Sequence, residues 1–141
     1  NRAASRRVAY RHEVSSMIHL DTSFLIHALV PSSRADQRLR KWLRGGEDLA
    51  MSSVAWTEFL CGPVGDHAME TVPAMLHEIA AYTAIDSETA AQLFNLCGRR
   101  RGTLADCMIA AVAIRAGAAL ATSNPKDFER FAPQGLTIVE E

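Results

Sequence analysis

The chain alternates short apolar runs with longer segments in which apolar residues recur at helical spacing. The short runs have the length and continuous hydrophobicity of strands that are covered on both faces of a sheet. In chain order, these predicted strands are 17–21 (MIHLD), 48–52 (DLAMS), 82–86 (YTAID), 119–122 (ALAT) and 136–140 (LTIVE).

The longer segments predict helices between these strands. Ser52 or Ser53 is expected to open one of them as the N-cap, and Gly62 with Pro63 to stop it. The other predicted helices start at about Thr22 or cover Ala35–Arg44, His67–Ala80, Ser87–Arg99 and Thr103–Ala116. Strands joined by helical crossovers favour an α/β protein, a three-layer α/β/α domain around a mainly parallel sheet.

Residues 1–16 differ from the rest of the chain in pattern and in charge. They show no sustained periodicity, and they carry four arginines and one glutamate, a net charge of +3, whereas residues 17–141 carry 11 basic and 15 acidic residues, a net charge of −4. We interpret residues 1–16 as an appendage, either non-native or upstream sequence, and residues 17–141 as a single domain. The acidic domain argues against a binder that relies on neutralising nucleic-acid phosphates with basic residues alone.

Cysteine usage and hydropathy favour a cytoplasmic protein. The three cysteines, Cys61, Cys97 and Cys107, form no CxxC pair, so neither a disulfide framework nor a thiolate zinc site is indicated. No apolar run has the length of a membrane span, and the N-terminal residues lack the apolar centre of a secretory signal.

Three carboxylates occupy positions at which an α/β sheet collects ligands. Asp21 directly follows the first predicted strand, Glu58 lies inside the apolar segment VAWTEFL, and Asp106 lies one turn into a helix that is apolar on nearly every side. Each also has a structural explanation: Asp21 as a helix N-cap, Glu58 as a surface acid, and Asp106 as part of a capping box with Thr103. Ligands bind beyond the carboxyl ends of parallel strands, which favours a shared site.

A further polar group follows the fourth predicted strand. Thr122, Asn124 and Asp127 come directly after ALA, although Asn124-Pro125 also suits a turn or a helix start. Several carboxylates in one cleft repel one another unless they are protonated or offset by cations, and hard oxygen ligands favour Mg²⁺ or Mn²⁺. The sequence therefore predicts a divalent-metal site.

The ordered series LDTSFLI, AWTEFL, LADCMIAAVAI and LATSNPKDFERF resembles the motifs of PIN domains in VapC-type toxins. The resemblance covers roughly residues 17–141 and implies that Asp21, Glu58 and Asp106 are the metal-binding, catalytic carboxylates. It implies a fourth acidic position at Asp127 or, in its place, Asn124. Thr22 beside Asp21, and Thr122, match supporting polar positions.

The same resemblance implies a metal-dependent endoribonuclease that acts as the toxin of a VapBC-type toxin–antitoxin pair. Its cofactor would be Mg²⁺ or Mn²⁺, its substrate RNA, and its partner a VapB-like antitoxin whose tail covers the cleft, with a homodimer or a hetero-oligomer as the assembly. Arg99, Arg100 and Arg101 precede the Asp106 helix and are candidates for RNA contact, although cations at a helix C-terminus also complement the helix dipole.

Two other function classes compete with this interpretation. An aspartyl-phosphate phosphatase also carries an Asp after the first strand, but it usually needs a second Asp two residues later, where this chain has Ser23. A catalytically silent module with the same fold would bind a partner without cutting RNA, and the complete set of carboxylates argues against it. Cleavage of DNA by the same site stays open, because metal-assisted phosphodiester chemistry does not itself distinguish the sugars.

Overall fold

The computed structural model describes residues 17–140, and the appendage inferred for residues 1–16 lies outside the described residues. Five parallel strands form one sheet in the order β3-β2-β1-β4-β5. The strands are β1 (Met17–Leu20), β2 (Asp48–Ser52), β3 (Glu78–Ala80), β4 (Ala119–Ala121) and β5 (Thr137–Ile138). The predicted three-layer α/β/α class is confirmed, with an all-parallel sheet.

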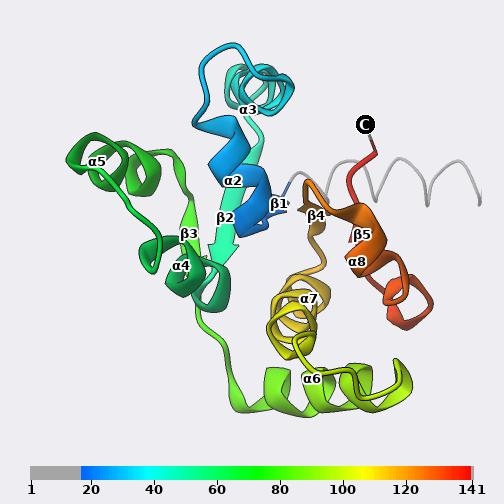
Figure 1. Ribbon diagram of the computed structural model, residues 1–141. Coiled ribbons are helices and arrows are strands. Elements are labelled where there is room, and N and C mark those ends of the chain that lie inside the picture. Colours follow the sequence, from blue (N-terminus) through cyan, green and yellow to red (C-terminus); the bar gives the residue numbers. More distant parts are fainter. Residues whose placement is uncertain (1–16, 141) are drawn as a thin grey trace, which may run out of the picture.

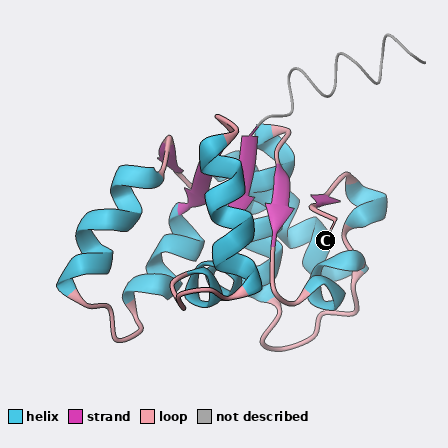
Figure 2. Ribbon diagram, turned by 90° about the horizontal axis from the view of Figure 1, so that it is seen from above, coloured by secondary structure: helices cyan, strands magenta, loops and turns pink. Residues whose placement is uncertain are grey.

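Helices fill every connection between the strands. In chain order they are α2 (Thr22–Ala28), α3 (Arg34–Arg44), α4 (Ser53–Leu60), α5 (Asp66–Met75), α6 (Ala84–Leu96), α7 (Leu104–Ala116) and α8 (Pro125–Glu129), followed by the 3-10 turn η1 (Ala132–Gln134). Figure 1 shows α6 and α7 on one side of the strands and α2, α3 and α5 on the other, and Figure 2 shows the strands as a row in the middle of the molecule. Within residues 17–140, no helix has both the length and the hydrophobicity needed to cross a bilayer.

The third strand was predicted in the wrong place. The prediction put a helix over His67–Ala80 and a strand at 82–86, whereas α5 ends at Met75 and residues 78–80 form β3. Pro73 inside α5 lacks the N–H that a continuing helix needs, and Leu76 already has extended backbone angles (φ −86°, ψ 134°). The strand then pairs with β2, with Met51 opposite Ile79.

Residues 82–86 instead begin α6. Thr83 and Asp86 form a capping box, in which the backbone N–H of Asp86 donates to the Thr83 hydroxyl and the Thr83 N–H donates to the Asp86 carboxylate. The Asp86 carboxylate is fully buried and also receives Nε of Arg115 at 2.8 Å, which ties α6 to α7. The capping box therefore starts a helix here, although the aromatic and β-branched residues of this segment favour a strand.

The core consists of the apolar sides of β1, β2 and β4 with the inner faces of α2, α4 and α7. Leu20, Leu49 and Leu120 from the three strands are fully buried, as is Ala110 in the middle of α7. The alanine-rich sequence of α7 lets this helix pack closely against its neighbours. The first turn of α7, which contains Asp106, is thereby fixed relative to the carboxyl ends of β1 and β4.

Candidate active site

Asp21 lies immediately beyond β1, where its backbone N–H donates to the carbonyl of Ala121 at 2.9 Å and so extends the pairing with β4. Asp21 occupies the N-cap position of α2, but its side chain makes no capping hydrogen bond. Oδ2 instead accepts the hydroxyls of Ser23 at 2.7 Å and Thr122 at 2.8 Å. The structure thus places a buried carboxylate at the end of the central strand, and its hydrogen bonds go to hydroxyl groups and not to the N-terminus of α2.

A group of hydroxyls from two segments far apart in sequence surrounds Asp21. The Ser23 and Thr122 hydroxyls are 3.3 Å apart, and the Ser123 N–H donates to Ser23 Oγ at 3.2 Å. The Asn124 N–H donates to Thr122 Oγ1 at 3.0 Å, so the backbone after β4 is fixed by the same hydroxyl that contacts Asp21. Thr122 was predicted as a supporting residue, whereas Ser23 was not predicted to belong to the site.

Glu58 reaches the same end of the sheet from α4. Thr22 Oγ1 lies 2.9 Å from the carbonyl oxygen of Ala55 and 3.3 Å from Glu58 Oε1, so this hydroxyl links the start of α2 to α4. Although the side chain reaches the surface, partial burial of the carboxyl group and the nearby charge of Asp21 raise the pKa of Glu58. The Thr22 hydroxyl opposes this rise by hydrogen bonding to the charged form.

Asp106 lies in the first turn of α7 and interacts electrostatically with all the other predicted acids. Burial raises its pKa to about 6, together with the negative charges of Asp21, Asp127 and Glu58 in decreasing order. The predicted capping box with Thr103 is wrong, because the Thr103 hydroxyl donates to the carbonyl of Arg100 at 2.6 Å and does not cap α7. The four carboxylates therefore share one electrostatic environment.

Asp127 and Asn124 lie at the start of the short helix α8. Asn124 is the N-cap residue, with Pro125 as the first helical residue, yet the Asn124 side chain makes no capping hydrogen bond. The exposed Asp127 contributes to the raised pKa of Asp106, so Asp127 is the better placed candidate for a fourth acid.

The cation whose charge acts on Asp106 is Arg130, which follows α8. Its Nε donates to the backbone carbonyl of Asp127 at 3.0 Å, and its guanidinium lies 5.2 Å from the centre of the Phe131 ring. Arg99, Arg100 and Arg101 are exposed in the loop between α6 and α7. Sequence reasoning missed Arg130, whose only signal was a basic residue three positions after Asp127.

The donor set has the chemistry that a hard divalent cation requires. Within residues 17–140 no hydrogen bond reaches Oδ1 of Asp21, and the raised pKa values of Glu58 and Asp106 show that these groups would gain from a nearby positive charge. As they stand, no three His, Cys, Asp or Glu side chains in the described part of the chain are close enough to enclose an ion. Mutual repulsion of the carboxylates is a physical reason for this spread, and their oxygen atoms are of the type that a hard divalent cation binds.

Comparison with known proteins identifies the fold family. The PIN domain model matches residues 18–133, and the chain belongs to the PIN domain family. No curated protein is significantly similar to the chain in sequence.

Solved structures with the same fold come from several bacteria. VapBC2 from Rickettsia felis, bound to a DNA fragment from its promoter, has 20% identity and a TM-score of 0.68 over 87% of this chain and 97% of its own. VapBC from Salmonella typhimurium, bound to DNA, has 22% identity and a TM-score of 0.67 over 87% and 96%. A toxin–antitoxin complex from Klebsiella pneumoniae has 26% identity and a TM-score of 0.63 over 79% and 89%.

Proposed function

We propose that this PIN-domain protein is a Mg²⁺- or Mn²⁺-dependent endoribonuclease and the toxin of a VapBC-type toxin–antitoxin pair. The observation that carries the proposal is the electrostatic coupling of Asp106 to Asp21, Glu58 and Asp127 at the carboxyl end of the sheet. Asp21, Glu58 and Asp106 would hold the metal, with Asp127 as the fourth acid. The bound metal supplies an activated water and neutralises charge on the phosphate that is attacked.

The protein's own residues orient the site. Ser23 and Thr122 hold Oδ2 of Asp21 by two hydrogen bonds, which restricts rotation of this carboxylate. Thr22 lies between α2 and α4, near enough to Glu58 to limit its range of positions. Arg130 offers a positive charge near Asp106, which favours the approach of an anionic strand to the otherwise acidic site.

Metal dependence is the first test of this function. We expect the purified wild-type chain to cleave single-stranded RNA in the presence of Mg²⁺ or Mn²⁺. Cleavage should stop when EDTA is added. Asp21→Asn should lower the rate at least about 100-fold, because it removes the anchored carboxylate that would contact the metal. Both metals should also raise the melting temperature of the wild type but not of Asp21→Asn. Cleavage in EDTA, or full activity in a folded Asp21→Asn protein, would falsify the proposal.

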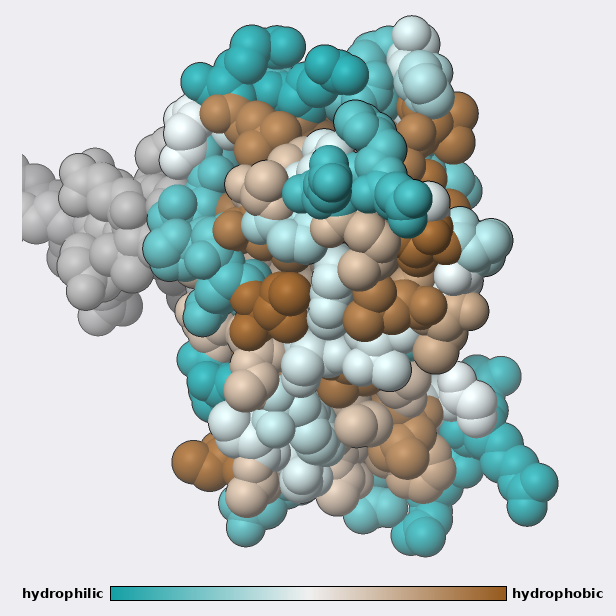
Figure 3. Space-filling model, turned by 90° about the vertical axis from the view of Figure 1, so that its left-hand side faces the viewer, coloured by the Kyte–Doolittle hydropathy of each residue, from teal (hydrophilic) through white to brown (hydrophobic). Residues whose placement is uncertain are grey.

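An apolar groove between α2, α4 and α5 supports an antitoxin partner. Ile26, Leu29, Phe59, Pro63 and Val64 line it, and Ile26 is 53% exposed. Figure 3 shows patches of hydrophobic surface on the side of the molecule that carries α5. Apolar patches rimmed by polar residues mark protein interfaces, and the structurally similar VapBC and toxin–antitoxin proteins were solved as complexes.

The partner is tested by co-expression with the product of an adjacent gene. We expect expression of the chain alone to arrest growth and the partner to relieve the arrest by forming a hetero-oligomer. Ile26→Glu should reduce complex formation at least about tenfold, because it places a charge in an apolar contact. Ile85→Glu is the matched control, since Ile85 is 65% exposed on α6. Equal loss of binding in both variants, or relief of growth arrest without formation of a complex, would contradict the proposal that the antitoxin binds in this groove.

A further inference from the structure

The loop between α6 and α7 carries three consecutive exposed arginines, Arg99, Arg100 and Arg101. Within residues 17–140, none of their guanidinium groups takes part in a hydrogen bond or an ion pair. In the sequence, no acidic residue occurs between Glu88 and Asp106. This arginine loop is therefore a local concentration of unpaired positive charge in a domain that has more acidic than basic residues.

Hydrogen bonds at both ends fix the backbone of the arginine loop. Gly98 follows α6 with a left-handed backbone (φ 86°), and the N–H of Arg99 donates back to the carbonyl of Phe94 at 2.9 Å. The Arg100 carbonyl accepts the hydroxyl of Thr103 at 2.6 Å and the N–H of the same residue at 3.3 Å. Thr103 immediately precedes α7, so the loop has a defined position relative to the first turn of this helix.

The arginine loop lies next to the segment that carries Arg130. Cys97, at the end of α6, has its sulfur 4.0 Å from the carbonyl oxygen of Arg130, and Figure 1 shows the loop on the side of the molecule that carries α8. The charge of Arg130 acts on Asp106, which follows Thr103 by three residues, about 4.5 Å along the helix axis. The loop and Arg130 thus provide cations on the Asp106 side of the carboxylate site.

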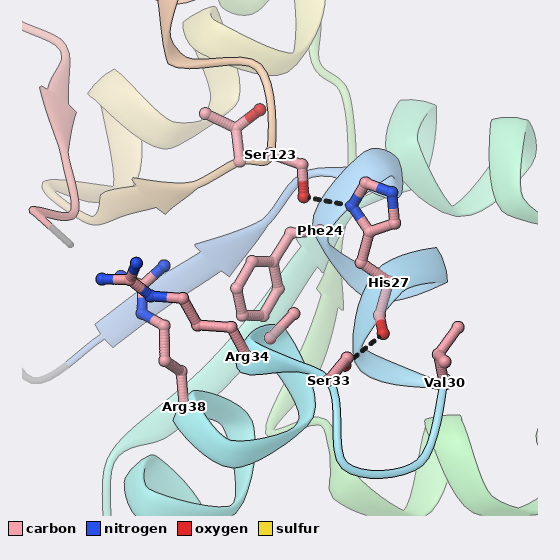
Figure 4. A pocket seen from close by; sticks show the side chains of 9 residues that line it. Phe24, His27, Val30, Ser33, Arg34, Arg38 and Ser123 are labelled. Atoms are coloured by element: carbon pink, nitrogen blue, oxygen red, sulfur yellow. Dashed lines mark hydrogen bonds between the residues drawn. The ribbon is translucent and has the colours of Figure 1, made fainter.

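Two arginines on α3, by contrast, are already engaged. Figure 4 shows the guanidinium groups of Arg34 and Arg38 close together, and both side chains have partners within the protein. Arg38 lies over the rings of Phe24 and Trp42, and one of its nitrogens donates to the carbonyl of Glu140 at 3.0 Å. The pocket beside them is lined mostly by apolar surface. These two arginines therefore do not provide the free donors that a phosphate group requires.

We propose that the arginine loop, together with Arg130, binds the phosphates of the RNA strand on the Asp106 side of the carboxylate site. The inference rests on the proposed ribonuclease function and names the surface that holds the substrate. Successive arginines with free donors fit a chain of phosphates, because each guanidinium presents a planar fork of N–H groups that pairs with phosphate oxygens. Phosphate contacts carry no sequence information, so this surface should hold RNA of any sequence.

An RNA strand fits this surface better than an acidic segment of a partner protein does. The apolar groove proposed for the antitoxin includes α2 and α5, which lie on the opposite side of the strands from α6 and α7. The arginine loop is instead connected to the carboxylate site through Arg130 and Asp106. Because the carboxylates repel a polyanion, cations beside them are needed to retain an RNA substrate.

The binding test uses the Asp21→Asn protein, which should hold RNA without cutting it. Fluorescence anisotropy of a labelled single-stranded RNA of mixed sequence, at constant Mg²⁺, measures Kd. Adding Arg100→Ala and Arg101→Ala together should weaken binding about five- to twentyfold. The two substitutions should also lower the slope of log Kd against log salt by about 1.4, the value for two lost phosphate contacts on a single strand.

Two controls separate phosphate binding from effects on folding and on total charge. Arg44→Ala removes an exposed arginine on α3, far from the loop in sequence, and should change neither Kd nor the salt slope. The melting temperature of the Arg100→Ala, Arg101→Ala protein should equal that of its parent, because neither guanidinium is bonded within residues 17–140. A Kd and a salt slope equal to those of the Arg44→Ala control would overturn the proposal.

The kinetic test distinguishes failure of this surface from failure of the ribonuclease function. In the otherwise wild-type chain, Arg100→Ala with Arg101→Ala should raise KM for RNA about five- to twentyfold and leave kcat within about twofold. Metal-dependent cleavage with an unchanged KM overturns the phosphate-binding surface alone. Weaker binding of the antitoxin by this variant, with RNA binding unchanged, also overturns it and assigns the loop to an acidic segment of that partner. Absence of metal-dependent cleavage by the wild type overturns both proposals.

Discussion

Asp106→Asn is expected to abolish RNA cleavage and, in metal-free buffer, to make the protein more stable. The Asp106 carboxyl is half-buried among three other acids, which raises its pKa to about 6. At neutral pH the folded protein therefore contains an ionised group whose charge opposes folding. The neutral amide has nearly the same shape and removes that cost.

The expected gain in stability is modest, and the loss of activity is large. A rise of two pKa units corresponds to about 3 kcal/mol, but solvent screening of this half-exposed group reduces the expected gain to about 1 kcal/mol. The rate of cleavage should fall by about three orders of magnitude, since an amide oxygen is a poor substitute for a charged metal ligand. Urea unfolding with EDTA present measures the first quantity, and an RNA cleavage assay with Mg²⁺ measures the second.

Asp66→Asn is the matched control for Asp106→Asn. Asp66 is also in the first turn of a helix, α5, but is exposed and lies outside the group of acids that act on Asp106. The free energy of unfolding of this variant should change by less than about 0.5 kcal/mol. Its rate of RNA cleavage should equal that of the wild type. A destabilised Asp106→Asn protein would contradict the interpretation that like-charge repulsion dominates at this position.

Asp86→Ala is expected to produce the largest loss of stability among simple substitutions of charged residues. The Asp86 carboxylate is fully buried, and it accepts Nε and one terminal nitrogen of Arg115 at 2.8 and 3.1 Å. It also accepts the Thr83 N–H at 2.9 Å and the Thr83 hydroxyl at 3.0 Å. Removing the carboxylate leaves these donors without their acceptor and loosens the packing of α6 on α7.

The expected cost of Asp86→Ala is about 3 kcal/mol, at the lower end for a broken buried ion pair because the Arg115 side chain is 40% exposed. Urea unfolding measures this cost. Glu88→Ala, an exposed acid on the same helix, should cost less than about 0.5 kcal/mol. A loss for Asp86→Ala as small as that of the control would show that the ion pair contributes nothing to stability.

The pH dependence of unfolding gives a second reading of the same interaction. The pKa of Asp86 in the folded protein is lowered by the Arg115 guanidinium and the Thr83 hydrogen bonds, which together outweigh the opposing effect of burial, the largest single contribution. An acid with a lowered folded pKa stabilises the fold above its unfolded pKa of about 4 and loses that stabilisation as the pH falls toward the folded value. Asp86→Asn should therefore show a smaller loss of stability on acidification than the wild type.

Most of the fold is predictable from local pattern. The strand at Asp48–Ser52 and the helices containing Glu58 and Asp106 lie where apolar periodicity and helix-start signals put them, because a buried element must be apolar on the faces it covers. The third strand was misplaced because His77–Ala80 continues a helical apolar spacing. Pairing with β2 decides its conformation, and no local signal reports that pairing.

The sequence by itself determined the residue types, their order, and the position of Asp21 after a strand, which are sufficient for the family resemblance and for the expectation of a metal. Only the tertiary structure decided how these residues interact. The hydrogen bond from Thr122 to Asp21 joins positions 101 residues apart, and the coupling of Asp106 to Arg130 depends on the packing of α7 beside α8. The physical reason is that electrostatic and hydrogen-bond energies depend on distance in space. The order of residues along the chain does not give that distance; the pairing of β1 with β4 in the sheet does.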